Sequence, residues 1–147
     1  MTSAAWAQRR PSETSAGCPE LGDWAQRSAA DVTMARRQLR AQLSGPGGRA
    51  AAADDVERLL LAFEELASNG VRHGRPPVRV RVLATSTGWL IDVSDDSVDA
   101  PPAPAVDRDP AHGGLGLHLI AELAASHGWF AEDGRKHVWA VVCRTAS

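Results

Sequence analysis

The sequence has few cysteines and no long apolar run. Its two cysteines, Cys18 and Cys143, lie far apart and lack the spacing of metal ligands, which indicates a reducing compartment rather than a disulfide framework. No run approaches the roughly 20 apolar residues that span a bilayer. The first residues lack the apolar segment of a signal peptide. We therefore expect a cytoplasmic protein without a membrane segment.

An excess of charge of one sign is missing too. The formal net charge is −2, and the basic residues, of which only Lys136 is a lysine, are scattered along the chain. This balance gives no reason to expect nucleic acid or an acidic membrane as a partner. The 147 residues, 44% of them hydrophobic, fit one globular domain with a single core.

Composition and periodicity divide the chain into a leader and a domain. Residues 1–20 are rich in small and polar residues and predict a disordered leader, followed by a domain over 21–147. Apolar residues at helical spacing predict one helix over 29–43 and a second from the Asp54-Asp55 pair to about residue 70.

Strands follow the second helix. Strict alternation predicts a strand over 78–84, and WLIDVS (89–94) predicts its hairpin partner. Proline-rich residues 98–112 predict a lid, a binding loop or a disordered segment. A helix over 117–128 closed by Gly128 and a hairpin of 129–131 with 137–144 complete the pattern. The order predicts an α+β fold, a two-layer α/β sandwich with helices on one face of a mixed, mostly antiparallel sheet.

Three polar clusters interrupt these elements. Glu65 and Asn69 are i, i+4 neighbours opposite the apolar stripe of their helix, so they face water or a cleft. Asp95 follows a buried strand, and a glycine-rich stretch leads into the third helix. Each cluster alone has an ordinary structural explanation: a helix end, a turn and a loop.

In order, the clusters resemble a known arrangement. ELASNGVRHG from Glu65, VSDDSVDAPP with Asp95, GLGLHLI and the tail GRKHVWAVV are similar to the motifs of the GHKL (Bergerat-fold) ATP-binding domain. Within that family the chain resembles the small anti-sigma-factor serine kinases. The resemblance covers residues 28–144.

The resemblance implies a site for ATP and Mg²⁺. Asn69 would be a metal ligand, and Glu65 would accept a proton from an attacking hydroxyl or water. Asp95 would accept a hydrogen bond from the exocyclic amine of adenine, where guanine has an acceptor. The phosphates would lie against a loop and helix N-terminus formed by Gly114, Leu115, Gly116 and Leu117. Residues 98–112 would close over the nucleotide as a lid.

Other polar residues are weaker candidates. Arg72, His73 and Lys136 are placed to contact phosphates, but we favour ordinary surface positions for the first two and a solvated hairpin lysine for the third. His112 and His118 have no partner at metal-ligand spacing.

The family implies a protein serine/threonine kinase. Such a kinase would phosphorylate an anti-anti-sigma (STAS-type) protein and act as an anti-sigma factor, and relatives suggest a homodimer. An alternative is a non-catalytic module that senses ATP and sequesters a partner protein. The catalytic core of a histidine kinase shares the fold, but residues 1–50 offer no helix pair with a phospho-accepting histidine.

Overall fold

The computed structural model of the chain describes residues 6–12, 17–44, 52–98 and 115–145. Within these ranges the chain forms five strands and three helices. In order they are β1 (Glu20–Gln26), α1 (Ala29–Ser44), α2 (Ala53–His73), β2 (Val78–Ala84), β3 (Gly88–Asp95), α3 (Leu115–Leu123), β4 (Ser126–Glu132) and β5 (Arg135–Cys143). None of the helices in these ranges is both long and apolar enough to cross a membrane.

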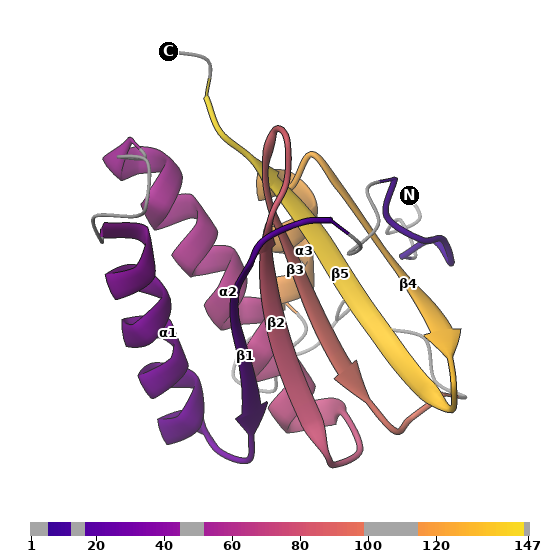
Figure 1. The fold of residues 1–147 in the computed structure, drawn as a ribbon. Coiled ribbons are helices and arrows are strands. Elements are labelled where there is room, and N and C mark those ends of the chain that lie inside the picture. Colours follow the sequence, from indigo (N-terminus) through magenta and orange to yellow (C-terminus); the bar gives the residue numbers. More distant parts are fainter. Residues whose placement is uncertain (1–5, 13–16, 45–51, 99–114, 146–147) are drawn as a thin grey trace.

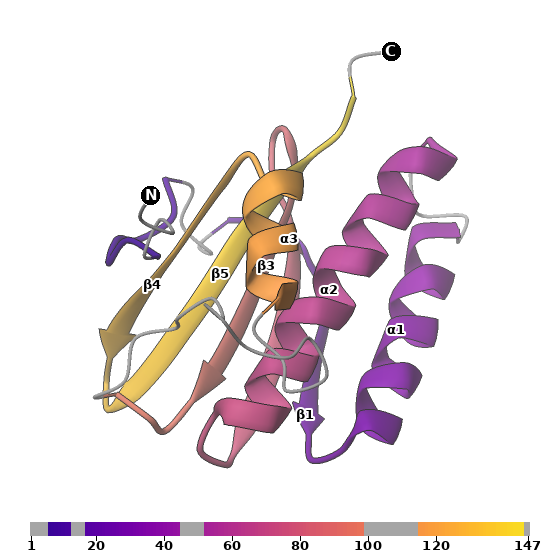
Figure 2. The same ribbon diagram turned by 180° about the vertical axis from the view of Figure 1, so that it is seen from behind.

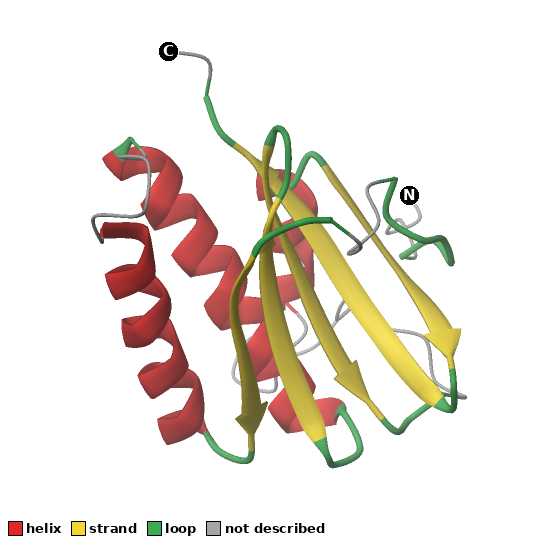
Figure 3. Cartoon of the chain, in the orientation of Figure 1, coloured by secondary structure: helices red, strands yellow, loops and turns green. Residues whose placement is uncertain are grey.

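The strands form one sheet with the helices on one of its faces. The strand order is β1-β2-β3-β5-β4, and each neighbouring pair is antiparallel. Figures 1 and 3 show the helices as one layer and the sheet as the other. The predicted α+β two-layer sandwich is thereby confirmed.

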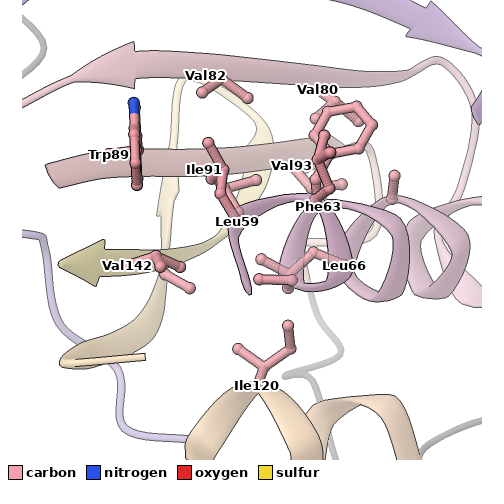
Figure 4. Close-up of a cluster of buried hydrophobic side chains, with 14 of the residues drawn as sticks. Leu59, Phe63, Leu66, Val80, Val82, Trp89, Ile91, Val93, Ile120 and Val142 are labelled. Atoms are coloured by element: carbon pink, nitrogen blue, oxygen red, sulfur yellow. The ribbon is translucent and has the colours of Figure 1, made fainter. Parts of the chain in front are cut away.

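The core lies between α2 and the centre of the sheet. Leu59, Phe63 and Leu66 of α2 are buried against the strands, and Figure 4 shows them facing valine and isoleucine side chains of β2 and β3. Ile120 of α3 approaches from another side (Figure 4). Full burial of one such side chain stabilises the fold by about 1.5–3 kcal/mol. The apolar stripe therefore fixes which face of α2 meets the sheet.

Helix α1 lies against the flank of α2 that faces β1 (Figure 1). Its buried stripe is Val32, Ala35, Leu39 and Leu43. The Arg40 guanidinium donates to both carboxylate oxygens of Glu57 on α2, at 2.8 and 3.3 Å. The opposite flank of α2 packs against α3, as Figure 2 shows.

Two elements differ from the predictions. Strand β1 was not predicted, because its pairing with β2 is irregular between Glu20 and Gly22 and the segment lacks clean alternation. The third helix ends at Leu123, and Gly128 lies inside β4 instead of closing a helix. A Cβ atom at position 128 would come within 3.1 Å of the Trp139 ring and 2.9 Å of Arg9 Cγ, so glycine serves close packing there.

Residues 6–12 pack against β4. Trp6 is only 3% exposed, and its ring lies 4.4 Å from the His127 ring. Gln8 forms a parallel bridge with Trp129, and the Arg9 amide donates to the Trp129 carbonyl at 2.8 Å. This packing departs from the disordered leader expected over 1–20. Residues 1–5 and 13–16 lie outside the described residues.

Candidate functional site

Glu65 and Asn69 lie on the flank of α2 that faces α3 and β5. Arg58, two turns before Glu65 on the same face, donates to the carbonyl of Cys143 on β5 at 3.3 Å. Ala62 and Leu66, each three residues before one of the polar pair, are buried. Glu65 and Asn69 themselves are partly exposed. The pair therefore borders the α2–α3 side of the molecule.

Gly70 brings the last turns of α2 directly onto the sheet. A Cβ atom at this position would come within 2.7 Å of Val93 Cγ1 and 3.3 Å of Val78 Cγ1. Because β-branched valine side chains are stiff, only glycine permits this approach. Helix α2 does not end at Asn69-Gly70: it continues to His73, and the Gly74 amide donates to the Gly70 carbonyl at 2.8 Å. Gly70, the residue after Asn69, is thus held against Val93, two residues before the end of β3.

Asp95 is the last residue of β3 and is 2% exposed. Its Oδ1 atom accepts hydrogen bonds from the backbone amides of Arg75, at 3.3 Å, and Ser97, at 2.6 Å, and from the Ser97 hydroxyl. A carboxylate held by several donors is locked in one orientation. These bonds join the chain after α2 to the chain after β3.

The second oxygen of Asp95 lies beside Gly74 and Lys136. A Cβ atom at position 74 would come within 2.9 Å of Asp95 Oδ2, so the absence of a side chain leaves space next to this oxygen. Lys136 Nζ lies 3.8 Å from the same atom. Oδ1 therefore fixes the local fold, whereas Oδ2 adjoins the space left by Gly74.

Lys136 is not the solvated hairpin lysine that we predicted. It is 7% exposed and lies opposite Asp95 in the β3–β5 pair. The hairpin turn is formed by Asp133 and Gly134, both with positive φ, so Lys136 already belongs to the strand. The available signal was its period-two relation to Val138, which is buried on the face that α2 covers.

Arg135 is a contact residue that the sequence analysis did not single out. Its guanidinium donates to Asp96 Oδ1 at 2.7 Å, to the Pro77 carbonyl at 2.7 Å and to the Ser94 hydroxyl at 3.0 Å. It therefore ties the start of β5 to the residues before β2 and after β3. Five N–H donors in a planar group suit this task.

The glycine-rich stretch is described only in part. Leu115 and Gly116 form the first residues of α3, and the Leu117 side chain is buried in the core. Any contact of Leu117 with phosphate would therefore use its backbone. Gly114 and the predicted lid, apart from Val98, lie outside the described residues. Arg72 and His73 are exposed in the last turn of α2, in agreement with surface positions.

The fold and this arrangement match one family of known domains. Residues 25–142 match the family model described as a histidine kinase-like ATPase domain. The match spans α1, α2 and α3 and contains Glu65, Asn69 and Asp95. No curated protein shows significant similarity to the chain.

Proposed function

Because the chain belongs to the family of histidine kinase-like ATPase domains, which are ATP-binding domains of the GHKL type, we propose that it is a protein serine/threonine kinase. Its substrate would be an anti-anti-sigma protein of the STAS type, and it would act as an anti-sigma factor towards a sigma factor. The observation that carries the proposal is the placement of a carboxylate, Glu65, one helical turn from Asn69 on a helix that ends beside Asp95.

The polar groups at the end of β3 support adenine as the base that would bind there. Asp95 Oδ2 is a hydrogen-bond acceptor beside a position where a side chain would fill the space. The exocyclic amine of adenine supplies the matching donor, whereas guanine has an acceptor at that position. Oδ1 is held by Arg75 and Ser97, which keeps the carboxylate oriented without the nucleotide. Asp95 is therefore the proposed adenine-binding residue.

Helix α2 would align the phosphates. Asn69 precedes Gly74 by five residues, or about 7.5 Å along the helix axis, and Glu65 lies about 6 Å further back. The Asn69 amide oxygen is a hard ligand suited to Mg²⁺, which takes its other ligands from phosphates and water. Bound Mg²⁺-ATP would supply the phosphoryl group and the charge neutralisation that its transfer requires.

Glu65 is the proposed general base. As the oxygen of a substrate serine or threonine bonds to the γ-phosphorus and ADP leaves, the hydroxyl proton would pass to the Glu65 carboxylate. Its position one turn from Asn69 would put this base next to the proposed metal ligand. The Leu115–Leu117 backbone at the start of α3 would donate to the phosphates from the other side.

Phosphotransfer with matched variants tests the proposal. The purified protein, Mg²⁺-ATP and STAS-type proteins of the same genome are combined, and phosphoserine or phosphothreonine is measured. We expect Glu65→Gln to bind ATP normally and to lose transfer by about 10²–10⁴-fold. Glu64→Gln, its neighbour on a different face of α2, serves as the control and keeps activity. Transfer at the wild-type rate by Glu65→Gln would show that the base is misassigned.

The same measurement separates the two functional candidates. Tight ATP binding without transfer to any STAS-type protein would support the non-catalytic ATP-sensing module that sequesters a partner. Absence of ATP binding would contradict both.

A further inference from the structure

Lys136 is buried although lysine seldom is. It is also the only lysine in the sequence, and its side chain is 9% exposed against 3% for that of Asp95. Removing an ammonium group from water is costly unless it is paired. The ion pair with Asp95 offsets part of that cost, but a buried ion pair by itself is weak evidence for a role in stability. The position therefore calls for a second explanation.

The two charged groups form an acceptor–donor pair at the base end of the proposed ATP site. Asp95 and Lys136 are cross-strand neighbours on the sheet face covered by α2. Asp95 Oδ1 is occupied by Arg75 and Ser97, and Oδ2 is the oxygen nearer Lys136 Nζ. An ammonium group carries three donors, so one group can serve both a carboxylate and a ligand atom.

This pair has the hydrogen-bonding pattern complementary to one edge of adenine, with an acceptor at Asp95 and a donor at Lys136. The 6-amino group of adenine is a donor, and the adjacent N1 atom is an acceptor. Guanine has the reverse pattern, with an acceptor at O6 and a donor at N1. If Asp95 accepts from the 6-amino group of adenine, a donor beside Asp95 would face N1, which is an acceptor. Both contacts would then be favourable.

We propose that Lys136 reads the base of the nucleotide by donating a hydrogen bond to N1 of adenine, while Asp95 accepts one from the 6-amino group. This inference rests on the proposed ATP binding and adds a second specificity residue to it. It puts Lys136 at the base end of the site, whereas the sequence had made it only a weak candidate for a phosphate contact. The ammonium is compact and carries three donors, so it can serve both Asp95 Oδ2, 3.8 Å away, and an atom of the base.

The test is a comparison of ATP with 1-deaza-ATP, in which a C–H group replaces N1. Calorimetry with Mg²⁺ would measure both affinities for the wild-type protein. We expect 1-deaza-ATP to bind about 10- to 100-fold more weakly, the range for a hydrogen bond to a charged group. In Lys136→Met, ATP binding should weaken and the difference between the two nucleotides should largely disappear. Lys136→Arg, which keeps a charged donor, should retain part of the difference between the two nucleotides.

A purely structural role of Lys136 gives a different result. Loss of an ion pair that only orients Asp95 would weaken both nucleotides equally and leave their ratio unchanged in Lys136→Met, which would overturn the inference. Arg79→Met is the control, because Arg79 pairs with Asp23 at 2.7 Å on the other face of the sheet. It should change neither affinity.

The outcomes distinguish the inference from the function on which it rests. If the wild-type protein binds ATP and 1-deaza-ATP equally, the inference is wrong and the proposed kinase stands. This comparison needs no substitution, so it decides even if Lys136→Met does not fold. If the wild-type protein binds neither nucleotide, both are wrong.

Discussion

Gly70 of α2 packs so closely against Val93 of β3 that a Cβ atom at position 70 would lie only 2.7 Å from Val93 Cγ1. This contact sets the height of the helix above the sheet at the residue next to Asn69. Val93 lies two residues before Asp95 on β3. The distance between the proposed metal-binding amide and the proposed adenine-binding carboxylate therefore depends on a glycine that carries no chemistry itself.

Gly70→Ala should destabilise the protein. Overpacking against Val93 costs about 1–3 kcal/mol, against a gain of about 1 kcal/mol from the higher helix propensity of alanine. Urea unfolding would measure the net loss, and ATP affinity should fall with it. Ser68→Ala, on the same helix and away from the sheet, is the control. Unchanged stability in Gly70→Ala would mean that the helix shifts without cost.

Gly74→Ala should weaken nucleotide binding, and the last turn of α2 must shift to admit the methyl group. The new Cβ atom would lie 2.9 Å from Asp95 Oδ2 and 2.6 Å from the Gly70 carbonyl. Loss of one hydrogen bond to the carboxylate corresponds to about 10- to 100-fold in affinity. Arg75→Ala provides the comparison, because Arg75 bonds to Asp95 through its backbone and its side chain is exposed. Equal ATP affinities for the two variants would argue against adenine at Oδ2.

Trp6→Ala should unfold at lower denaturant concentration. Trp6 is buried against the His127 ring and belongs to the main core cluster. Truncation of a buried tryptophan costs about 3–5 kcal/mol. Arg10→Ala removes an exposed side chain from the same segment and should cost far less. A small effect of Trp6→Ala in urea unfolding would show that residues 6–12 are dispensable for the fold.

Stability should fall as the pH drops below neutrality. Burial lowers the pKa of His127 below its ordinary value of 6.5, and the nearby Arg9 guanidinium lowers it further. The unfolded chain then binds a proton more readily than the folded one, so this stability is complete above pH 6.5 and is lost as the pH falls towards the folded-state pKa. His127→Gln should flatten that part of the curve of unfolding free energy against pH. If the unfolding free energy of His127→Gln has the same slope against pH as that of the wild-type protein, other groups cause the pH dependence.

Hydrophobic periodicity was sufficient to predict most of the fold. Helices α1 and α2 and strands β2 and β3 have long, regular patterns whose buried faces match the observed core. The elements that the patterns missed depend on tertiary contacts. Strand β1 is irregular near Gly22 and gains its structure by pairing with β2. Gly128 fits a strand only because Trp139 and Arg9 pack against it.

The positions of the candidate site residues were predictable where they depend on a single helix or strand. Glu65 and Asn69 share one face of α2, and Asp95 ends a strand that was recognised from its pattern. The burial of Lys136 could have been inferred from its period-two relation to Val138, but its position opposite Asp95 follows from the β3–β5 register. The register depends on strand pairing over 41 residues of chain, as between Asp95 and Lys136, and local patterns do not contain it.

The segment before β1 has a practical consequence for protein production. Arg9 accepts a hydrogen bond from the Trp139 indole at 2.8 Å, and the Arg10 guanidinium lies over the Phe130 ring at 4.6 Å. A recombinant version shortened to begin at Glu20 would expose both aromatic rings and leave the outer edge of β4 without its neighbour. Edges of that kind pair with other chains. Expression vectors should therefore keep residues 6–12, with purification tags attached at the C-terminal end.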